Sequence, residues 1–225
     1  GFAGTLGWRD GGVTREEALT HAWAVVEATD LPASADLENG FGHEPSAAAK
    51  TVQRAAEAGL VGCSIEGFSG DPDLGFYDPD SAVARIAASA DAARAVGFAF
   101  TLTGRSENFI RGNPDLDDTI ARLKAYEPAG ADVLMAPGLP DIAAVKTVCD
   151  ALSKPFNFMV GIPEKSFTVA ELAGAGVKRI SLATSLYRAA MSGVVAAATE
   201  AKENGTFSFV DSSMPTPEFA GYMRG

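Results

Sequence analysis

The chain has 225 residues, of which 47% are hydrophobic and 21% charged, a composition that indicates one globular domain with a single core and excludes a disordered chain. Its formal net charge is −11, which disfavours nucleic acid and anionic membrane surfaces as partners. The sequence shows no leader peptide and no run of eighteen apolar residues, and its two cysteines lie far apart in apolar segments, so we expect a soluble, cytoplasmic protein with free thiols.

Helical and strand-like segments alternate along the chain, beginning with a helix over residues 14–28. Apolar strand-like runs cover residues 32–36, 60–65, 98–102, 131–135, 155–160 and 177–182. The helices expected between them cover residues 44–58, 81–96, 116–129, 140–152 and 169–175. Glycine follows four of these helices, at positions 59, 97, 130 and 176, because glycine adopts the left-handed conformation at a helix C-terminus at little cost.

This alternation predicts a parallel sheet covered by helices, and the continuous apolar strands agree with burial on both faces. The first strand is not followed by a G-x-G-x-x-G motif, which disfavours a dinucleotide-binding doubly wound sheet. A (β/α)8 TIM-type barrel needs eight strands, whereas this sequence shows six. Either the N-terminal strands lie outside this chain or the sheet is open. We treat residues 1–225 as a single α/β catalytic domain.

Acidic residues gather where the first three strands end, which is the edge at which parallel α/β folds place their functional groups. Asp36 and Glu38 are two residues apart, Glu66 ends the second strand, and Arg105 and Glu107 follow the third. Converging carboxylates repel one another, and a hard divalent cation such as Mg2+ is the usual remedy. The alternative is that these acids cap helices or face solvent, and their spacing alone does not decide between the two.

Other residues near these strand ends are candidates for the wall of a binding pocket. The glycine-rich turn around Gly40 would let the backbone approach a ligand, and His43 follows that turn at the expected mouth of the site. Trp8 is a candidate for a pocket wall or for the core, and Asp10 lies close to it in the sequence. Residues 67–78 are rich in glycine, proline and aspartate, which fits either a solvated connector or a mobile lid.

Residues 34–42, 62–66 and 104–109 resemble the isocitrate lyase/phosphoenolpyruvate mutase superfamily, and the similarity extends to residues 4–10 and 129–134. The resemblance implies an α/β barrel whose chain continues upstream of Gly1. It also implies a homo-oligomer, expected to be a tetramer, in which the C-terminal helix is exchanged between subunits. The proline-containing tail at residues 214–219 is the candidate for that helix.

The same resemblance implies roles for individual residues. Asp36 matches the direct Mg2+ ligand, and Glu38 matches an acid that acts on the metal through water. Glu66 and Asp10 match acids of the metal's water shell. Arg105 matches the arginine that binds the substrate carboxylate, a role that suits its planar, two-pronged donor.

The implied activity is that of a Mg2+-dependent lyase or oxo-acid hydrolase, which makes or breaks a C–C bond in a small anionic 2-oxo-carboxylate through a metal-stabilised enolate. Residues 67–78 contain neither the cysteine nor the histidine of the lyase branch, and Gly67 stands where the mutase branch has an aspartate. Phosphonomutase or phosphonopyruvate hydrolase chemistry on a P–C bond is one alternative. A barrel that binds a metabolite without catalysis is another. The general acid or base is open, with Glu107 as one candidate.

Overall fold

The computed structural model describes residues 1–223, and the chain divides into two compact units, Gly1–Ala183 and Thr184–Gly225. The first unit contains a six-stranded sheet. Its strands are β1 (Ser34–Asp36), β2 (Gly62–Glu66), β3 (Thr101–Arg105), β4 (Val133–Met135), β5 (Phe156–Met159) and β6 (Arg179–Ser181).

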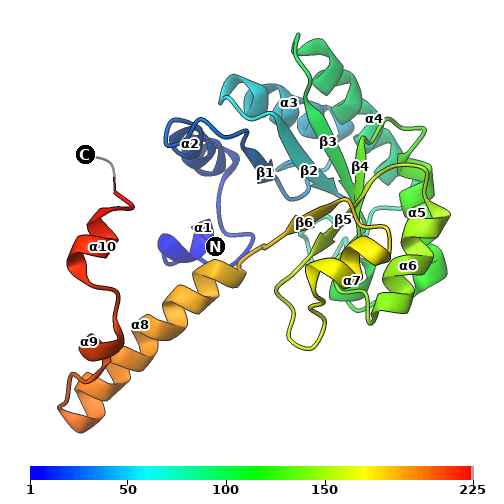
Figure 1. Ribbon diagram of the computed structural model, residues 1–225. Helices are drawn as coiled ribbons and strands as arrows, with labels where there is room; N and C mark the ends of the chain where they lie inside the picture. The colour runs from blue at the N-terminus through cyan, green and yellow to red at the C-terminus, as the bar shows by residue number, and fades with distance from the viewer. Residues whose placement is uncertain (224–225) are drawn as a thin grey trace. The chain divides into compact units, whose positions relative to one another are not determined.

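The strands of this sheet pair in the order of the sequence, β1-β2-β3-β4-β5-β6, and every pairing is parallel. A doubly wound sheet reverses its strand order at a switch point, whereas a barrel places each new strand beside the previous one. The sheet curls into a half-barrel with helices on its outer side (Figure 1). The predicted α/β class is confirmed as a partial TIM-type barrel, and the doubly wound alternative is excluded.

The helices of the first unit alternate with the strands as expected, except that α1 (Phe2–Thr5) and α2 (Arg15–Val26) both precede β1. The others are α3 (Pro45–Glu57), α4 (Pro79–Ala95), the 3-10 turn η1 (Asn108–Ile110), α5 (Leu116–Tyr126), α6 (Ile142–Ala151) and α7 (Val169–Gly174). The second unit contains α8 (Ser185–Asn204), α9 (Phe209–Ser212) and α10 (Thr216–Ala220). The sequence analysis did not predict α1, α8 or α9, although Gly205 ends α8 in the same left-handed conformation that marks the earlier helices.

The strands begin slightly later than expected, because the turns at the preceding helix ends occupy those residues. Gly59, Gly130 and Gly176 have φ values of 86°, 104° and 101°. The residue after each glycine donates its backbone N–H to a carbonyl five residues earlier: Leu60 to Ala55, Ala131 to Tyr126, and Val177 to Leu172. These bonds satisfy carbonyls at the helix ends and turn the chain into the next strand.

The core lies between the sheet and its outer helices. Alanines bring α3 close to the sheet, with Ala48 and Ala55 fully buried, and larger side chains such as Leu134 and Val145 fill the layer further along.

Within the described residues, no helix combines the length and the apolarity needed to cross a membrane.

We predict that Leu134→Ala destabilises the protein by about 2–5 kcal/mol, because it removes a fully buried side chain of β4 and leaves a cavity behind. Urea unfolding measures the change. Leu31→Ala is the matched control, since the Leu31 side chain is 74% exposed and its truncation should change the stability by less than about 0.5 kcal/mol. Equal losses in the two variants would contradict the assignment of the core.

Candidate active site

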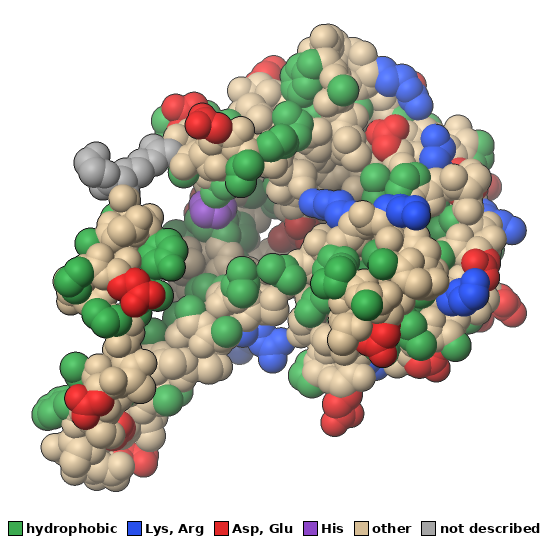
Figure 2. All heavy atoms as spheres, viewed as in Figure 1, with side chains coloured by type: hydrophobic (Ala, Val, Ile, Leu, Met, Phe, Trp, Pro, Cys, Tyr) green, Lys and Arg blue, Asp and Glu red, His purple; other side chains and the backbone are tan. Residues whose placement is uncertain are grey.

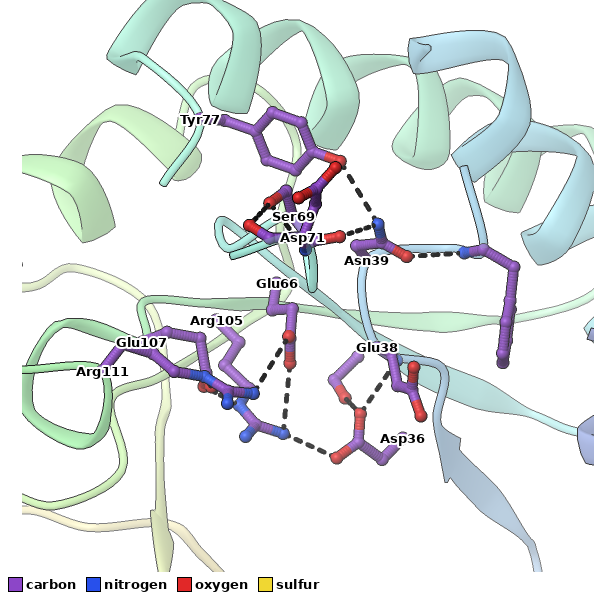
Figure 3. Close-up of polar contacts among 12 residues, drawn as sticks. Asp36, Glu38, Asn39, Glu66, Ser69, Asp71, Tyr77, Arg105, Glu107 and Arg111 are labelled. Atoms are coloured by element: carbon purple, nitrogen blue, oxygen red, sulfur yellow. Dashed lines mark hydrogen bonds and ion pairs between the residues drawn. The ribbon is translucent and has the colours of Figure 1, made fainter. Parts of the chain in front are cut away.

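Three charged residues lie side by side because each is the last residue of its strand. Asp36 ends β1, Glu66 ends β2 and Arg105 ends β3. The parallel register pairs Glu66 directly with Arg105, and it pairs Asp36 with Ser64 of the neighbouring strand. The ends of three adjacent strands thus bring together residues that are far apart in the sequence, since Asp36 and Arg105 are 69 positions apart (Figure 3).

Arg105 is the central cation of this group. Its Nη1 donates to Asp36 Oδ2 at 2.6 Å and lies 3.7 Å from Glu66 Oε2, while its Nε donates to Glu107 Oε1. The side chain is only 8% exposed. Burial opposes the charge of the guanidinium, but the carboxylates of Asp36, Glu107 and Glu66 outweigh it and raise the pKa of Arg105 above its ordinary value.

Arg111 is a second cation of the site, which the sequence analysis missed. It follows Glu107 by four residues across the short turn η1, and its Nε lies 3.3 Å from Glu107 Oε2. Its Nη2 lies 3.8 Å from Glu66 Oε1, and its guanidinium carbon lies 4.6 Å from the centre of the Phe68 ring. The four-residue spacing from Glu107 was the signal available in the sequence.

Glu66 and Glu107 form a buried acidic pair between these two arginines. The Glu107 side chain is fully buried and that of Glu66 is 6% exposed. Burial, followed by the negative charge of Glu107, raises the pKa of Glu66 well above its ordinary value, and Arg105 and Arg111 offset only part of this rise. The pair therefore favours a state in which Glu66 holds a proton.

Glu38 follows β1 in a left-handed conformation, with φ of 51°, and its backbone N–H donates to Asp36 Oδ1 at 3.1 Å. Burial and then the charges of Asp36 and Asp10 raise the pKa of Glu38. Asp10 is therefore close enough to act on Glu38 electrostatically, although the two residues lie in different segments of the chain.

The site holds more carboxylates than cations. Arg105 and Arg111 face Asp36, Glu66 and Glu107, while Glu38 lies beside Asp36. Among residues 1–223, no three His, Cys, Asp or Glu side chains converge as a ready-made metal cage. The side chain of Asp36 is nevertheless 57% exposed. Hard oxygen donors with one accessible carboxylate fit Mg2+, which takes few protein ligands and keeps several waters.

The other residues predicted for the pocket have different surroundings. The carbonyl of Gly40 accepts from Thr51 Oγ1 at 2.7 Å, and a Cβ on Gly40 would lie 2.8 Å from the Cα of Ala48, so this glycine makes room for α3. His43 Nδ1 lies 3.0 Å from the Tyr77 hydroxyl. Trp8 is 57% exposed. The substrate-binding roles of Gly40, His43 and Trp8 stay predictions.

Residues 67–77, part of the segment expected as a connector or lid, form a hairpin. Phe68 and Phe76 pair as an antiparallel bridge, and their rings meet edge to face with centroids 5.2 Å apart. Gly67 lies at the base, where a Cβ would come within 2.5 Å of the Tyr126 hydroxyl oxygen. The phenol of Tyr126 thus occupies the space that a side chain at position 67 would need.

A cavity of about 540 Å3 extends along the concave face of the sheet, a volume that suits a small metabolite. Asp36 and Arg105 line it at the carboxyl ends of the strands. Arg179 lines it at the start of β6, where its Nη2 donates to Ser34 Oγ of β1 at 2.8 Å. Asp36 therefore faces a cavity that has Arg105 toward one end and Arg179 toward the other.

The sequence model of phosphoenolpyruvate phosphomutase matches residues 1–202. The chain is 30% identical over 199 residues to the 2-methylisocitrate lyase of Escherichia coli K12, covering 83% of this chain and 65% of that protein. It is 31% identical over 174 residues to the oxaloacetate decarboxylase of Paraburkholderia xenovorans LB400, covering 74% of this chain and 56% of that protein. The chain thus spans less than two thirds of the length of these two relatives.

Among solved structures, a Burkholderia cenocepacia J2315 protein described only as a lyase/mutase is 46% identical to this chain. The two folds superpose with a TM-score of 0.96, over 100% of this chain and 80% of that one. The half-barrel therefore occurs within a fold already observed by crystallography.

The raised pKa of Glu66 predicts how stability depends on pH. A carboxyl group whose pKa is higher in the folded than in the unfolded state stabilises the fold below its ordinary pKa, and this contribution is lost as the pH rises through the raised value. We expect Glu66→Gln to melt at a higher temperature than the parent at about pH 8 without divalent cations, with little difference near the ordinary pKa of glutamate, about 4.3.

Differential scanning calorimetry in EDTA measures this effect. Glu171→Gln is a control of opposite sign, because side-chain and backbone hydrogen bonds from Thr168 lower the pKa of Glu171 and stabilise its ionised form. The Glu171 variant should lose stability at the higher pH. A Glu66→Gln variant that follows the parent at every pH would contradict the assigned burial of this charge.

Proposed function

The chain belongs to the phosphoenolpyruvate phosphomutase family, and from this membership we propose that it is a Mg2+-dependent enzyme that makes or breaks a C–C bond in a small 2-oxo-carboxylate. Its relatives include a lyase and a decarboxylase. The observation that carries the proposal is the position of Arg105, buried at the strand ends between accessible Asp36 and buried Glu66, and lining the cavity.

In this proposal Asp36 would hold the cation directly, while Glu38, Glu66 and Asp10 would hold its water ligands. The accessible carboxylate of Asp36 and the uncompensated charge around Glu38 support this assignment. When bound, Mg2+ supplies a Lewis acid that polarises the oxo and carboxylate oxygens of the substrate. Asp36 would at the same time give up its bond to Arg105 Nη1, which leaves that donor for the substrate carboxylate.

The remaining residues of the site orient Asp36 and Arg105 and shield them from water. Glu107 is fully buried and accepts from both Arg105 and Arg111, so its proposed role is to fix the two guanidinium groups. The hairpin brings Phe68 over Arg111, and an apolar cover of this kind excludes water from a developing charge. The raised pKa of Glu66 favours the protonated form of its carboxyl group.

Two features favour C–C chemistry that does not depend on a cysteine. The hairpin contains no cysteine, and Cys63 of β2 is buried, which raises its pKa to about 12 and makes it a poor nucleophile or acid. Tyr126 fills the space beside Gly67, where the mutase branch has an acid. P–C bond chemistry remains the second candidate, because the family model that matches residues 1–202 is that of a phosphomutase.

The test is an assay of the purified protein with Mg2+ on oxaloacetate, isocitrate, methylisocitrate and phosphonopyruvate. We expect turnover of an oxaloacetate-type acid and negligible cleavage of isocitrate or methylisocitrate. Turnover of phosphonopyruvate alone would favour the P–C alternative. Calorimetric binding of oxalate, a planar mimic of enolpyruvate, without turnover of any acid would favour a metabolite-binding barrel.

Replacement of the proposed direct ligand provides the matching variant test. Asp36→Asn should abolish turnover at millimolar Mg2+ and weaken Mg2+ binding, because it removes one charge from the accessible ligand. Glu38→Gln should be milder, since its contact runs through water. Calorimetric Mg2+ titration and rate measurements are made on both variants. If the Glu38 variant lost both properties while the Asp36 variant kept them, the direct ligand would be the wrong residue.

We also propose that the chain forms a homo-oligomer, a tetramer as implied by the resemblance. The unit that begins at Thr184 contains α8, in which no residue is buried. Large apolar side chains are exposed along this unit: Leu186, Met191, Val194, Val195, Phe207, Val210, Met214, Phe219 and Tyr222. Hydrophobic side chains are visible on it in Figure 2. A unit this small with so much exposed apolar surface is stabilised by association with another copy.

We expect the parent to sediment as a species larger than a monomer at micromolar concentration. Val194→Glu combined with Val195→Glu should shift it toward the monomer, because both side chains are more than half exposed on α8 and would carry charge into the contact. Lys202→Glu on the same helix changes the charge without removing apolar surface and serves as the control. A parent that is monomeric throughout this range would contradict the proposal.

A further inference from the structure

The loop after β1 has a backbone that needs outside support. Glu38 and Phe41 have φ values of 51° and 57°, and Gly40 between them has φ of 79°. Non-glycine residues adopt this left-handed conformation at a cost in free energy, so they persist only where surrounding contacts determine the conformation. The loop also carries Glu38, two residues after Asp36. Whatever fixes residues 37–43 therefore fixes the proposed cation ligands.

Asn39 supplies much of that support, because both polar atoms of its side chain are bonded. Its Oδ1 accepts from the Phe41 backbone N–H at 2.9 Å. Its Nδ2 donates to the Ser69 carbonyl at 2.5 Å and to the Tyr77 hydroxyl at 3.3 Å. Ser69 and Tyr77 lie on either side of the Phe68–Phe76 pair at the base of the hairpin, and Figure 3 shows the Asn39 side chain directed toward both. The amide thus bonds the loop to itself through one atom and to the hairpin through the other.

Arg85 of α4 holds the same loop from the helix layer. The residue is 1% exposed, and its terminal nitrogens donate to the backbone carbonyls of Asn39 and His43. Its guanidinium carbon lies 4.2 Å from the centre of the Tyr77 ring. Carbonyl dipoles and an aromatic face thus surround a buried cation, whose burial is costly in free energy. The buried guanidinium of Arg85 therefore stabilises the conformation of this loop.

The base of the hairpin is itself fixed, so it can serve as an anchor. The Ser69 N–H donates to the Gly75 carbonyl at 2.9 Å, and the Tyr77 N–H donates to the Gly67 carbonyl at 3.1 Å. Arg122 Nη1 of α5 donates to the Tyr77 carbonyl at 3.0 Å. Both Ser69 and Tyr77 are buried. The side chain of Asn39 therefore bonds to a rigid element.

We propose that Asn39 is a positioning residue. Its hydrogen bonds to the hairpin base and to Arg85 fix the conformation of residues 37–43. The positions of the Asp36 and Glu38 carboxylates are fixed as a result. Only the expected change in Mg2+ affinity rests on the proposed function. Residues that orient metal ligands from behind change metal affinity by about 10–100-fold when removed. The fixed conformation of residues 37–43 is a separate consequence that can be measured without a metal.

The experiment combines calorimetric Mg2+ titration with amide hydrogen exchange of the metal-free protein, on full-length variants. Asn39→Ala should weaken Mg2+ binding by about tenfold and accelerate exchange in residues 37–43. Tyr77→Phe keeps the ring beneath Arg85 and removes the hydroxyl's hydrogen bonds to Asn39 and His43, so its effects should have the same direction and be about two- to tenfold. Tyr77→Phe also serves as the test should Asn39→Ala fail to fold.

Thr168→Ala is the control, because it removes the N-terminal cap of α7 and lowers stability without touching this network. It should leave Mg2+ affinity and exchange in residues 37–43 unchanged. If the parent binds no Mg2+, the proposed metal dependence fails, and the exchange data alone then decide the role of Asn39. Exchange in residues 37–43 that is the same in parent, Asn39→Ala and Tyr77→Phe would overturn the inference.

Discussion

The site depends on one buried guanidinium surrounded by acids. Arg105 ends β3 and contacts Asp36, Glu66 and Glu107, which come from the ends of three neighbouring strands. Removal of the cation would leave these carboxylates to repel one another in a region of low dielectric. The parallel register that pairs Glu66 with Arg105 is therefore electrostatically favourable. Asp36, the most exposed of the three acids, is the one that can exchange this partner for another cation.

Most of the fold could be predicted because its signals are local. The glycines at positions 59, 97, 130 and 176 have the left-handed φ values that end helices, and an apolar run follows each of them. Alternation then required a parallel sheet, although only the strand order distinguished a barrel from a doubly wound sheet. Helix α8 was missed because the sequence analysis followed helices that lead into a strand, and among the described residues no strand follows α8.

The acids of the site were easier to predict than the residues that support them. Strand ends can be located from an apolar run, which is why Asp36, Glu66 and Arg105 were found together. Arg85 lies in an alanine-rich helix and bonds to backbone carbonyls, so no complementary charge in the sequence pointed to it. The role of Gly40 beside a ligand stays a prediction, and the structure adds that this glycine also makes room for Ala48 of α3.

The hairpin limits where a lid could move. Its base contacts Asn39, Arg85 and Arg122, whereas Gly70 and Gly75 have positive φ values and open space where a Cβ would lie. Any closing motion is therefore confined to the tip between these two glycines, which contains two aspartates. An acidic tip approaching an anionic substrate would be repelled, unless the cations beneath it outweigh that charge. Arg111 under Phe68 and the divalent cation proposed at Asp36 would provide this balance. Substrate, cation and closed tip would then favour one another, which is how an acidic protein would retain an anion.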